Sequence, residues 1–336
     1  MNIVEAIQKL TDRQNLTENE VRDVINQIMR GEATSCQKGG FLTALKMKGE
    51  TTEEMLGAVK ALRDNFTPVQ IDKPVNLIDT CGTGGDGGKT FNVSTCVAIV
   101  AASGGAKIAK HGNRAISSKS GSADVLAELN IKTNYTSKES AEVIAKHGMA
   151  FLFAPQYNPA MKNVANERRE LGCRTLFNLI GPLSNPAPLT GQLLGIYDGT
   201  LVKSACKVLK DLGLNRALVV HGDDGLDEIT TTTTSTICEL NYGEIKEYKF
   251  DIEKYGFKRA KPEDIAGGNP KENAQIIMDI LKGTKGPKRD IVVINSGAAL
   301  YAAEIVDSLK EGFKKAEELI DSNKAYEKYR QLIQAI

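Results

Sequence analysis

The feature of this sequence that most limits its fold is a change of pattern that begins near residue 73. Short apolar runs alternate from there with segments of helical periodicity: VNLIDT, STCVAIVAAS, AKIAK, SADVLAEL, MAFLFA, RALVVHG, IVVINS and GAALYAAEIV. Such alternation predicts a mostly parallel central sheet flanked by helices, with IVVINS among its strands. TICELNYGEIKEYKF predicts a hairpin that turns at residues 241–243.

Residues 1 to about 66 lack this alternation and predict consecutive short helices. Thr17 and Thr51 each stand three residues before a glutamate, which is the pattern of a capping box. Further along, the segment 167–186 predicts a helix, a turn at Gly181-Pro182 and a loop, which could pack back on the first helices. The expected fold class is therefore α/β, with a small N-terminal helical domain beside a larger α/β domain.

Charge and composition argue against several classes of function. The chain has 43 basic and 42 acidic residues and a net charge of +1, so its total charge favours neither nucleic acid nor a membrane surface as a partner. No apolar stretch approaches the roughly 18 residues that a membrane helix needs. The six cysteines form no C-x-x-C pair, which favours reduced thiols in the cytoplasm over a metal ribbon or a disulfide framework.

A glycine-rich run from Asp79 to Thr90 directly follows the first predicted strand, and several explanations compete. Gly82, Gly84 and Gly87 fit the dinucleotide pattern G-x-G-x-x-G, but no acidic residue closes the next strand. A P-loop would need a glycine at Thr83. A plain structural turn is the simplest alternative, whereas phosphate binding by backbone amides explains the many glycines better.

Polar residues open the next predicted helix, from Asn92 to Thr95, where they could meet a polyphosphate or simply cap the helix at Ser94 or Thr95. The AKIAK strand then ends in a polar loop that starts at Lys110. Lys110 and Arg114 have the chemistry that holds phosphate oxygens, and a solvated run of surface charge is the alternative. His111 need not be a base, because a loop histidine that hydrogen-bonds locally is equally consistent.

The RALVVHG strand leads into an acidic turn with carboxylates at Asp223, Asp224, Asp227 and Glu228. Four carboxylates so close together repel one another, and Mg²⁺, which prefers a few carboxylates with waters and phosphates, would relieve the repulsion. Taken alone, the run could be a solvated turn. Ligands of open α/β sheets bind beyond the carboxyl ends of the strands, so the glycine, cationic and acidic turns should converge on one crevice.

Two arginines, Arg168 and Arg169, lie in the segment NVANERRELG. One guanidinium could bind a substrate carboxylate through two parallel hydrogen bonds. An ion pair with Glu167 or Glu170 on the helix surface is the alternative, and the sequence does not decide between them.

Together these motifs resemble those of the anthranilate phosphoribosyltransferase family. The matching segments run in order along nearly the whole chain: G-T-G-G-D (82–86), N-V-S-T (92–95), K-H-G-N-R (110–114), F-A-P (153–155), P-A-M-K (159–162), R-T-L-F-N-L-I-G-P (174–182) and D-E (227–228). The pair G-T-G-G-D and K-H-G-N-R is the most specific, because related pyrimidine nucleoside phosphorylases carry different versions of both. The resemblance implies transfer of the phosphoribosyl group of 5-phosphoribosyl 1-pyrophosphate to the amino group of anthranilate, in tryptophan biosynthesis.

The resemblance also implies an architecture and a site. The helical domain would be residues 1–68, with 169–187 packed onto it, and the α/β domain residues 71–168 and 188–336; the helical domain would form a homodimer. Anthranilate would contact Gly82, Asn113 and Arg168, and two Mg²⁺ ions would be held by Ser94, Asp227 and Glu228. Phosphoribosyl pyrophosphate would contact Gly82, Gly85, Asp86, Thr90, Asn92, Val93, Ser94, Thr95, Lys110, His111, Gly112, Asn113, Arg114, Ala115, Ile116, Ser117, Ser118 and Ser122.

One position departs from the family pattern. Asn158 precedes P-A-M-K where the family usually has histidine, at a place that helps line the route of the aromatic acceptor. In the expected reaction, pyrophosphate leaves the anomeric carbon as the neutral aromatic amine adds, so no residue is assigned as general base. The rival functions are transfer to another aromatic amine, phosphorolysis of a nucleoside, and nucleic-acid binding by a non-catalytic relative.

Overall fold

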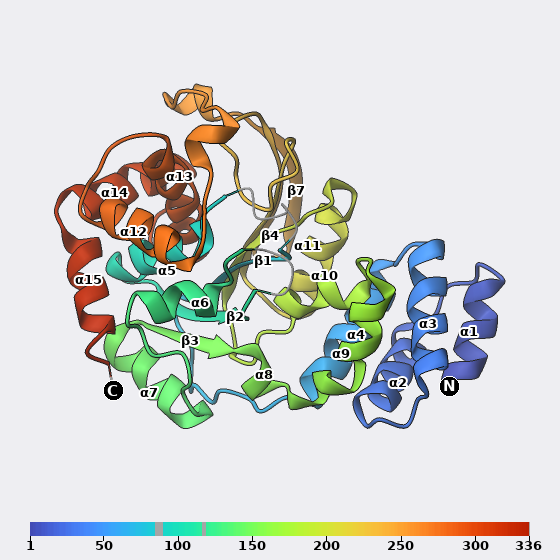
Figure 1. Ribbon diagram of the computed structural model, residues 1–336. Coiled ribbons are helices and arrows are strands. Elements are labelled where there is room, and N and C mark those ends of the chain that lie inside the picture. Colours follow the sequence, from blue (N-terminus) through green and yellow to red (C-terminus); the bar gives the residue numbers. More distant parts are fainter. Residues whose placement is uncertain (85–89, 116–118, 336) are drawn as a thin grey trace.

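The computed structural model describes residues 1–84, 90–115 and 119–335 and has a helical part beside an α/β part (Figure 1). The N-terminal helices are α1 (Ile3–Thr11), α2 (Glu18–Met29), α3 (Ser35–Lys48) and α4 (Thr52–Asp64). The strands are β1 (Leu77–Gly82), β2 (Lys107–Gly112), β3 (Met149–Phe153), β4 (Gly191–Gly195), β5 (Arg216–Gly222), β6 (Ser235–Asn241) and β7 (Glu244–Phe250). The later helices are α5 (Val93–Ser103), α6 (Ser122–Glu128), α7 (Ser137–His147), α8 (Ala154–Tyr157), α9 (Lys162–Leu171), α10 (Leu176–Leu183), α11 (Val202–Asp211), α12 (Pro270–Leu281), α13 (Pro287–Ala302), α14 (Leu309–Asp321) and α15 (Lys324–Leu332).

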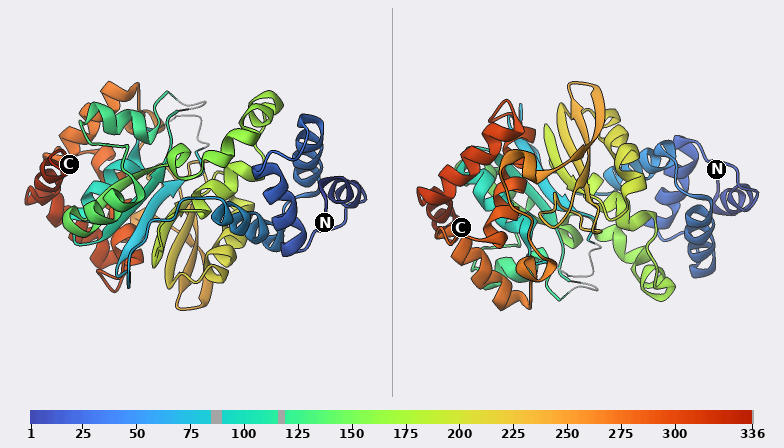
Figure 2. Two further views of the ribbon diagram at one scale, coloured as in Figure 1. Left: turned by 90° about the horizontal axis from the view of Figure 1, so that it is seen from below. Right: turned by 90° about the horizontal axis from the view of Figure 1, so that it is seen from above.

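Capping boxes define the starts of the N-terminal helices, as the sequence predicts for α2 and α4. The side chain of Thr17 accepts a hydrogen bond from the amide of Glu20, and the carboxylate of Glu20 accepts one from the amide of Thr17. Thr51 and Glu54 form the same pair of bonds. The helices α9 and α10 lie beside these helices (Figures 1 and 2). Lys38 of α3 pairs with Glu167 of α9 at 3.0 Å, so α9 joins the helical part together with α10.

The central sheet has the strand order β3-β2-β1-β4-β5-β6-β7. The strands β3, β2, β1, β4 and β5 are parallel, while β6 and β7 form the predicted antiparallel hairpin. Its turn places Tyr242 and Gly243 at φ 46° and 87°. The sequence pattern misses β4, because GQLLG begins and ends with glycine and offers a very short apolar run.

The two faces of the sheet bury different sets of helices, and residues alternate between them along each strand. Leu193 packs in the core shared with α5, α13 and α14, whereas Leu194 packs in the core shared with α4, α10 and α11. The second core continues without a break into the helical part, where it includes Phe41 and Leu62. The two parts are therefore joined by packed apolar side chains.

Two sequence-based expectations about local structure are wrong. The run IVVINS is not a strand but lies in α13, whose residues are buried almost all round, and a short apolar run fits a buried helix as well as a strand. Gly181 and Pro182 form no turn but lie in the last turn of α10. Pro182 has no amide hydrogen to donate to the preceding turn, and the helix ends one residue later, at Leu183.

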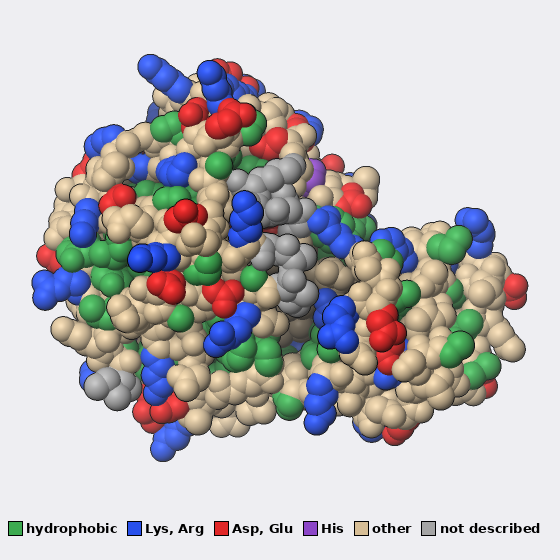
Figure 3. Space-filling view, viewed as in Figure 1, with side chains coloured by type: hydrophobic (Ala, Val, Ile, Leu, Met, Phe, Trp, Pro, Cys, Tyr) green, Lys and Arg blue, Asp and Glu red, His purple; other side chains and the backbone are tan. Residues whose placement is uncertain are grey.

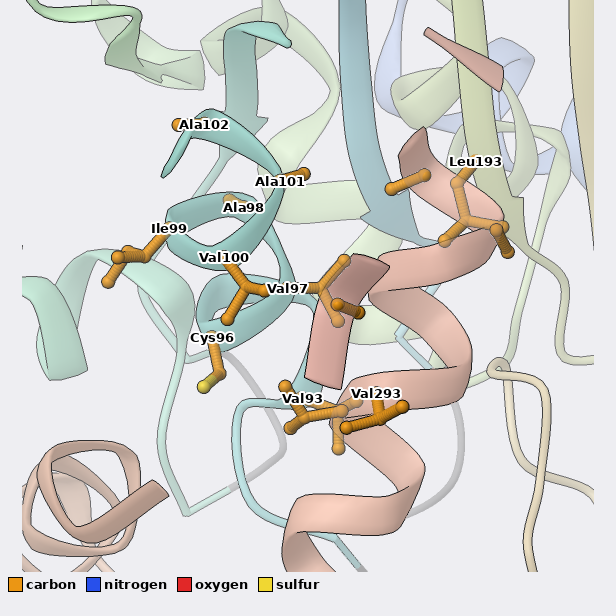
Figure 4. Close-up of a cluster of buried hydrophobic side chains, with 14 of the residues drawn as sticks. Val93, Cys96, Val97, Ala98, Ile99, Val100, Ala101, Ala102, Leu193 and Val293 are labelled. Carbon is orange, nitrogen blue, oxygen red and sulfur yellow. The ribbon is translucent and has the colours of Figure 1, made fainter. Parts of the chain in front are cut away.

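The helix α5 is packed on several sides by other elements of the α/β part (Figure 4). It contacts β1 and β2 on one side and α13 and α15 on others, and its residues from Val93 to Ala102 are buried apart from Ser94. Packing of this kind fixes the position of the N-terminus of α5 at the end of β1. Within the described residues, no helix is both long and apolar enough to cross a membrane.

Candidate active site

The glycine and acidic turns meet at the carboxyl edge of the sheet. β1 ends at Gly82 and β5 at Gly222, with β4 between them. The amide of Gly84 donates a hydrogen bond of 2.8 Å to Oδ2 of Asp227, although 143 residues separate them in the chain. The sequence therefore predicts correctly that these two turns converge.

Two glycines at strand ends make the space that the acidic turn fills. A Cβ on Gly82 would lie 2.3 Å from Oδ2 of Asp227, and a Cβ on Gly195 would lie 1.6 Å from the carbonyl oxygen of Asp227. Both separations are far inside van der Waals contact, so a side chain at Gly195 would have to displace the Asp227 backbone. The sequence pattern gives no signal for Gly195, because β4 itself was not recognisable.

The carboxylates of the acidic turn divide into two pairs. Asp223 accepts a hydrogen bond of 2.6 Å from Lys249, and Asp224 accepts one of 2.6 Å from the hydroxyl of Thr230. These two acids therefore hold the turn together. Asp227 and Glu228, both half-buried, are the pair at the end of the turn, and Asp227 accepts a hydrogen bond from the glycine turn.

Lys110 is not a loop cation, because β2 continues through Gly112 and includes it. Its side chain is 1 % exposed, and Nζ donates to the carbonyl oxygen of Thr80 and, at 3.3 Å, to the hydroxyl oxygen of Ser94. Burial lowers the pKa of Lys110, while attraction to Asp79 opposes this change. A buried ammonium thus lies next to the first turn of α5.

Asp79 provides a buried carboxylate on the neighbouring strand. It accepts hydrogen bonds of 2.8 Å from Asn185 and 3.2 Å from the amide of His111. Burial raises the pKa of Asp79, and Lys110 is the leading influence that lowers it again. The two groups compensate each other's charge in the interior, so the loss of either would leave an uncompensated buried charge.

The first turn of α5 corrects the expectation that Ser94 or Thr95 caps the helix. Asn92 occupies the N-cap position, and its side chain makes no capping hydrogen bond. Oγ1 of Thr95 is buried and has no hydrogen-bond partner within the part of the chain that is described. The side chain of Val93 lies in the core, so Val93 can offer a ligand only its backbone.

An acidic residue that the sequence pattern did not single out organises the loop after β2. Oδ2 of Asp124, in α6, accepts hydrogen bonds from the amides of Ala115 (2.9 Å) and Gly121 (3.0 Å). Arg114 is exposed, and its guanidinium lies 3.9 Å from the same carboxylate. Asn113, also exposed, accepts a hydrogen bond from the amide of Arg114. The side chains of Asn113 and Arg114 are thus presented on a loop with fixed ends.

His111 also belongs to β2 and not to the loop. Burial lowers the pKa of His111 to about 4, against a smaller opposing effect of a hydrogen bond with the backbone of Gly181. The imidazole is therefore neutral at pH 7 and too weakly basic to serve as an effective general base, which agrees with the absence of an assigned base.

Arg168 is half-buried and lies over the ring of Phe177, 5.7 Å from its centre. Among the described residues, neither arginine forms an ion pair with Glu167 or Glu170. Glu167 pairs with Lys38, and Arg169 donates to Asn166. Burial lowers the pKa of Arg168. A partly desolvated guanidinium of this kind is well suited to a substrate carboxylate.

Asn158 lies between α8 and a 3₁₀ turn at Pro159–Met161, and it is 8 % exposed. Its Oδ1 has no hydrogen-bond partner among the residues that the structure describes.

The remaining predicted contacts of the donor lie in several places. Thr90 pairs with Ala266 in an isolated bridge, and Ser122 is the first residue of α6. Five predicted donor contacts lie outside the described residues: Gly85, Asp86, Ile116, Ser117 and Ser118.

The space-filling view shows a hollowed face between the helical and α/β parts, with Lys and Arg side chains on both of its sides (Figure 3). This arrangement places local positive charge on a molecule whose net charge is only +1. Such a distribution suits a small anionic substrate rather than an extended polyanion.

Comparison with known proteins identifies the class to which this fold and site belong. A model of the glycosyl transferase family, a/b domain, matches residues 74–326, and a model of the helical bundle domain of the same family matches residues 4–66. The chain is thus a glycosyl transferase with both parts that the family models describe.

Individual relatives narrow this class. Anthranilate phosphoribosyltransferase of Clostridium beijerinckii is 65% identical over 332 residues, which cover 99% of this chain and 98% of the relative. The crystal structure of anthranilate phosphoribosyltransferase from Thermus thermophilus has a TM-score of 0.92 at 39% identity and covers 98% of both chains. The Saccharomyces cerevisiae enzyme in complex with PRPP and Mg has a TM-score of 0.90 at 28% identity, covering 99% of this chain and 97% of its own. The chain belongs to the anthranilate phosphoribosyltransferases.

Proposed function

We propose that this chain transfers the phosphoribosyl group of 5-phosphoribosyl 1-pyrophosphate (PRPP) to the amino group of anthranilate at the carboxyl ends of β1, β2 and β5. The observation that carries the proposal is the hydrogen bond between Gly84 and Asp227, because it joins a glycine turn to a carboxylate turn. A diphosphate and its cation need both kinds of turn in one place. The yeast relative solved with PRPP and Mg supports the same chemistry.

The donor's diphosphate would lie at the N-terminus of α5. The first turn has no side-chain cap, the amide of Ser94 has no partner among the described residues, and the helix dipole adds partial positive charge. Gly82 and Thr90 lie on the two sides of the glycine turn that precedes α5. Asn113 and Arg114 project from the loop after β2, which Asp124 holds. Lys110 would act from the interior, through Ser94 and the local electrostatic potential, since it is buried.

The residues present fit magnesium. Asp227 and Glu228 supply hard oxygen ligands beside the glycine turn, and Ser94 adds a hydroxyl oxygen. Within the described residues, no group of three His, Cys, Asp or Glu side chains is placed to hold a metal ion. Phosphate oxygens and waters would complete the coordination, as is usual for Mg²⁺, and we propose two such ions. When bound, Mg²⁺ neutralises charge that develops on the departing pyrophosphate.

Arg168, together with Asn113 and Gly82, would hold anthranilate. Pairing with the carboxylate of anthranilate would offset the desolvation of the half-buried guanidinium. The yeast relative solved with 4-fluoroanthranilate supports an anthranilate-like acceptor. The aromatic amine needs no strong base, and the protein's main contribution is to align nitrogen with the anomeric carbon and to exclude water.

The experiment that tests this function removes the charges of the Asp227-Glu228 pair. The variant Asp227→Asn with Glu228→Gln should lose at least about 100-fold in kcat/KM, because transition-state charge stabilisation is lost. Turnover is followed by the loss of anthranilate fluorescence as Mg²⁺ and PRPP are varied. Asp223→Asn is the matched control, since Asp223 lies in the same turn but pairs with Lys249. Wild-type turnover by the double variant, or an equal loss in the control, would refute the assignment.

We also propose that the helical part forms a homodimer through the outer face of α1 and α3. Val4 is 46 % exposed and Met47 73 %, and the half-buried Ile7 and Ala44 belong to the same helices. Val4→Glu with Met47→Glu should yield a monomer in light scattering, whereas Val75→Glu, at an exposed valine outside that face, should not. The six free thiols are consistent with a cytoplasmic enzyme, as we further propose.

A further inference from the structure

The N-terminus of α5 has no side-chain cap although an asparagine, one of the best capping residues, occupies its N-cap position. The amides of Val93 and Thr95 donate to the carbonyl oxygens of Phe91 and Asn92, so that among the described residues the amide of Ser94 is the first-turn donor without a partner. Asn2 and Asn269 stand at the same position of α1 and α12, and each caps its helix with ψ at 164° and 171°. Asn92 has ψ at 69° and makes no capping hydrogen bond. The residue type therefore does not explain why α5 is uncapped.

The side chain of Asn92 is held elsewhere. Its Oδ1 accepts hydrogen bonds from the hydroxyl of Ser120 (2.9 Å) and from Nδ2 of Asn273 (3.0 Å), and its Nδ2 donates to the carbonyl oxygen of Ser120 (3.1 Å). An oxygen with two donors is a poor candidate for a third bond to the α5 amides. The loop after β2 and the helix α12 thus draw Asn92 away from its own helix.

Asn273 is well placed for this role because its own orientation is fixed. It is 2 % exposed, and its Oδ1 accepts a hydrogen bond of 2.7 Å from the amide of Gly268, which leaves Nδ2 to face Asn92. The segment before α12 also contacts the two residues Thr90 and Phe91, which precede α5. A Cβ on Gly267 would lie 2.5 Å from the Cα of Phe91, and Ala266 pairs with Thr90.

We propose that Asn273 is a positioning residue for the donor substrate: it holds Asn92 off the N-terminus of α5, so that the amide of Ser94 stays open to the diphosphate of PRPP. This inference rests on the donor site proposed above. Asn273 itself touches no substrate. When its side chain is lost, Asn92 is less firmly held and competes with the diphosphate for the amide of Ser94.

The test is Asn273→Ala, assayed with PRPP and anthranilate varied separately. The KM for PRPP and its Kd by calorimetry should rise about fivefold, which corresponds to about 1 kcal/mol, while the KM for anthranilate and kcat at saturation change less than twofold. Without PRPP, hydrogen exchange at the amide of Ser94 should slow as this amide gains a cap. Asn273→Asp keeps the acceptor for Gly268 but cannot donate to Asn92, so it should raise the same KM.

Asn269→Ala is the matched control, because it removes the cap of α12 and leaves the Asn273–Asn92 contact in place. It should lower the melting temperature without changing the KM for PRPP. The inference is overturned if both Asn273 variants keep the wild-type KM for PRPP, or if Asn269→Ala raises it equally. Should the Asp227 and Glu228 variant also leave turnover unchanged, the proposed function fails with it; if that variant loses turnover as expected, only this inference fails.

Discussion

The helices of the N-terminal part and the helix α5 differ in how they begin. α1, α2, α3 and α4 each start with a side-chain cap from Asn2, Thr17, Thr34 or Thr51, and each has a capping box. α5 starts at the edge of the sheet with its cap residue turned aside. Each cap contributes about 0.5–2 kcal/mol, so an uncapped helix gives up stability.

The difference shows where the chain favours stability and where it favours binding. In α5, burial among β1, β2, α13 and α15 compensates for the missing cap and keeps the helix in place (Figure 4). The amide of Ser94, which a cap would satisfy, is then available to an anion. The N-terminal helices lie outside the proposed donor site, and side-chain caps satisfy amides of their first turns.

The largest expected effect comes from the glycine that admits the acidic turn. Gly195→Ala must displace the backbone of Asp227, since the new Cβ would lie 1.6 Å from its carbonyl oxygen. A shift of about 1 Å at the reacting groups can cost roughly 100-fold, so kcat/KM should fall by at least that factor. Gly39→Ala in α3, where nothing lies within 4 Å, is the control and should leave kcat/KM unchanged. An equal kcat/KM for the Gly195 and Gly39 variants would contradict the view that the site, unlike the helical part, depends on a glycine without a side chain.

A smaller effect concerns the dependence of stability on pH. Burial lowers the pKa of His111 to about 4 from 6.5, so below pH 6.5 the unfolded chain binds a proton that the folded chain does not. The contribution of neutral His111 to the free energy of unfolding is therefore fully present above pH 6.5, and it is lost as the pH falls toward 4. Between pH 7 and pH 5 the loss should be about 2 kcal/mol.

Urea unfolding of the wild type and His111→Asn at both pH values measures this difference. The variant should lose about 2 kcal/mol less than the wild type over the same interval. Parallel losses in the two proteins would show that His111 is not shielded from water at the end of β2.

The smallest expected effect comes from removing a cap in the N-terminal helices, where capping should affect stability but not donor binding. Thr51→Ala removes the cap of α4 and should lower the free energy of unfolding by about 1 kcal/mol. The KM for PRPP should stay at the wild-type value, in contrast to the fivefold rise expected for Asn273→Ala. Thermal unfolding and steady-state kinetics on the same preparation check both. A change in the KM for PRPP would mean that capping in the helical part is not separable from donor binding.

Local patterns made much of this architecture predictable. The capping boxes at Thr17 and Thr51, the hairpin at 241–243 and the strands VNLIDT, AKIAK and RALVVHG follow from short-range periodicity and turn chemistry. The meeting of Gly84 with Asp227 was predictable as well, because strand ends in a parallel sheet lie on one edge.

Features that depend on tertiary packing were not predictable. IVVINS lies in a helix because α13 is buried on every side, which a six-residue pattern cannot reveal. Lys110 is an interior group because β2 runs further than its apolar residues suggest. Gly195 lies against Asp227, 32 residues away, Asp124 bonds to Ala115, 9 residues away, and Asn273 bonds to Asn92, 181 residues away. No local sequence motif identifies residues that act through such contacts.

The most direct test of the account is a crystal structure of this chain with PRPP and Mg²⁺. We expect diphosphate oxygens within hydrogen-bonding distance of the Ser94 amide at the start of α5, Mg²⁺ at Asp227 and Glu228, and Asn92 still bonded to Asn273. A diphosphate bound away from α5, with Asn92 turned back to cap that helix, would contradict it.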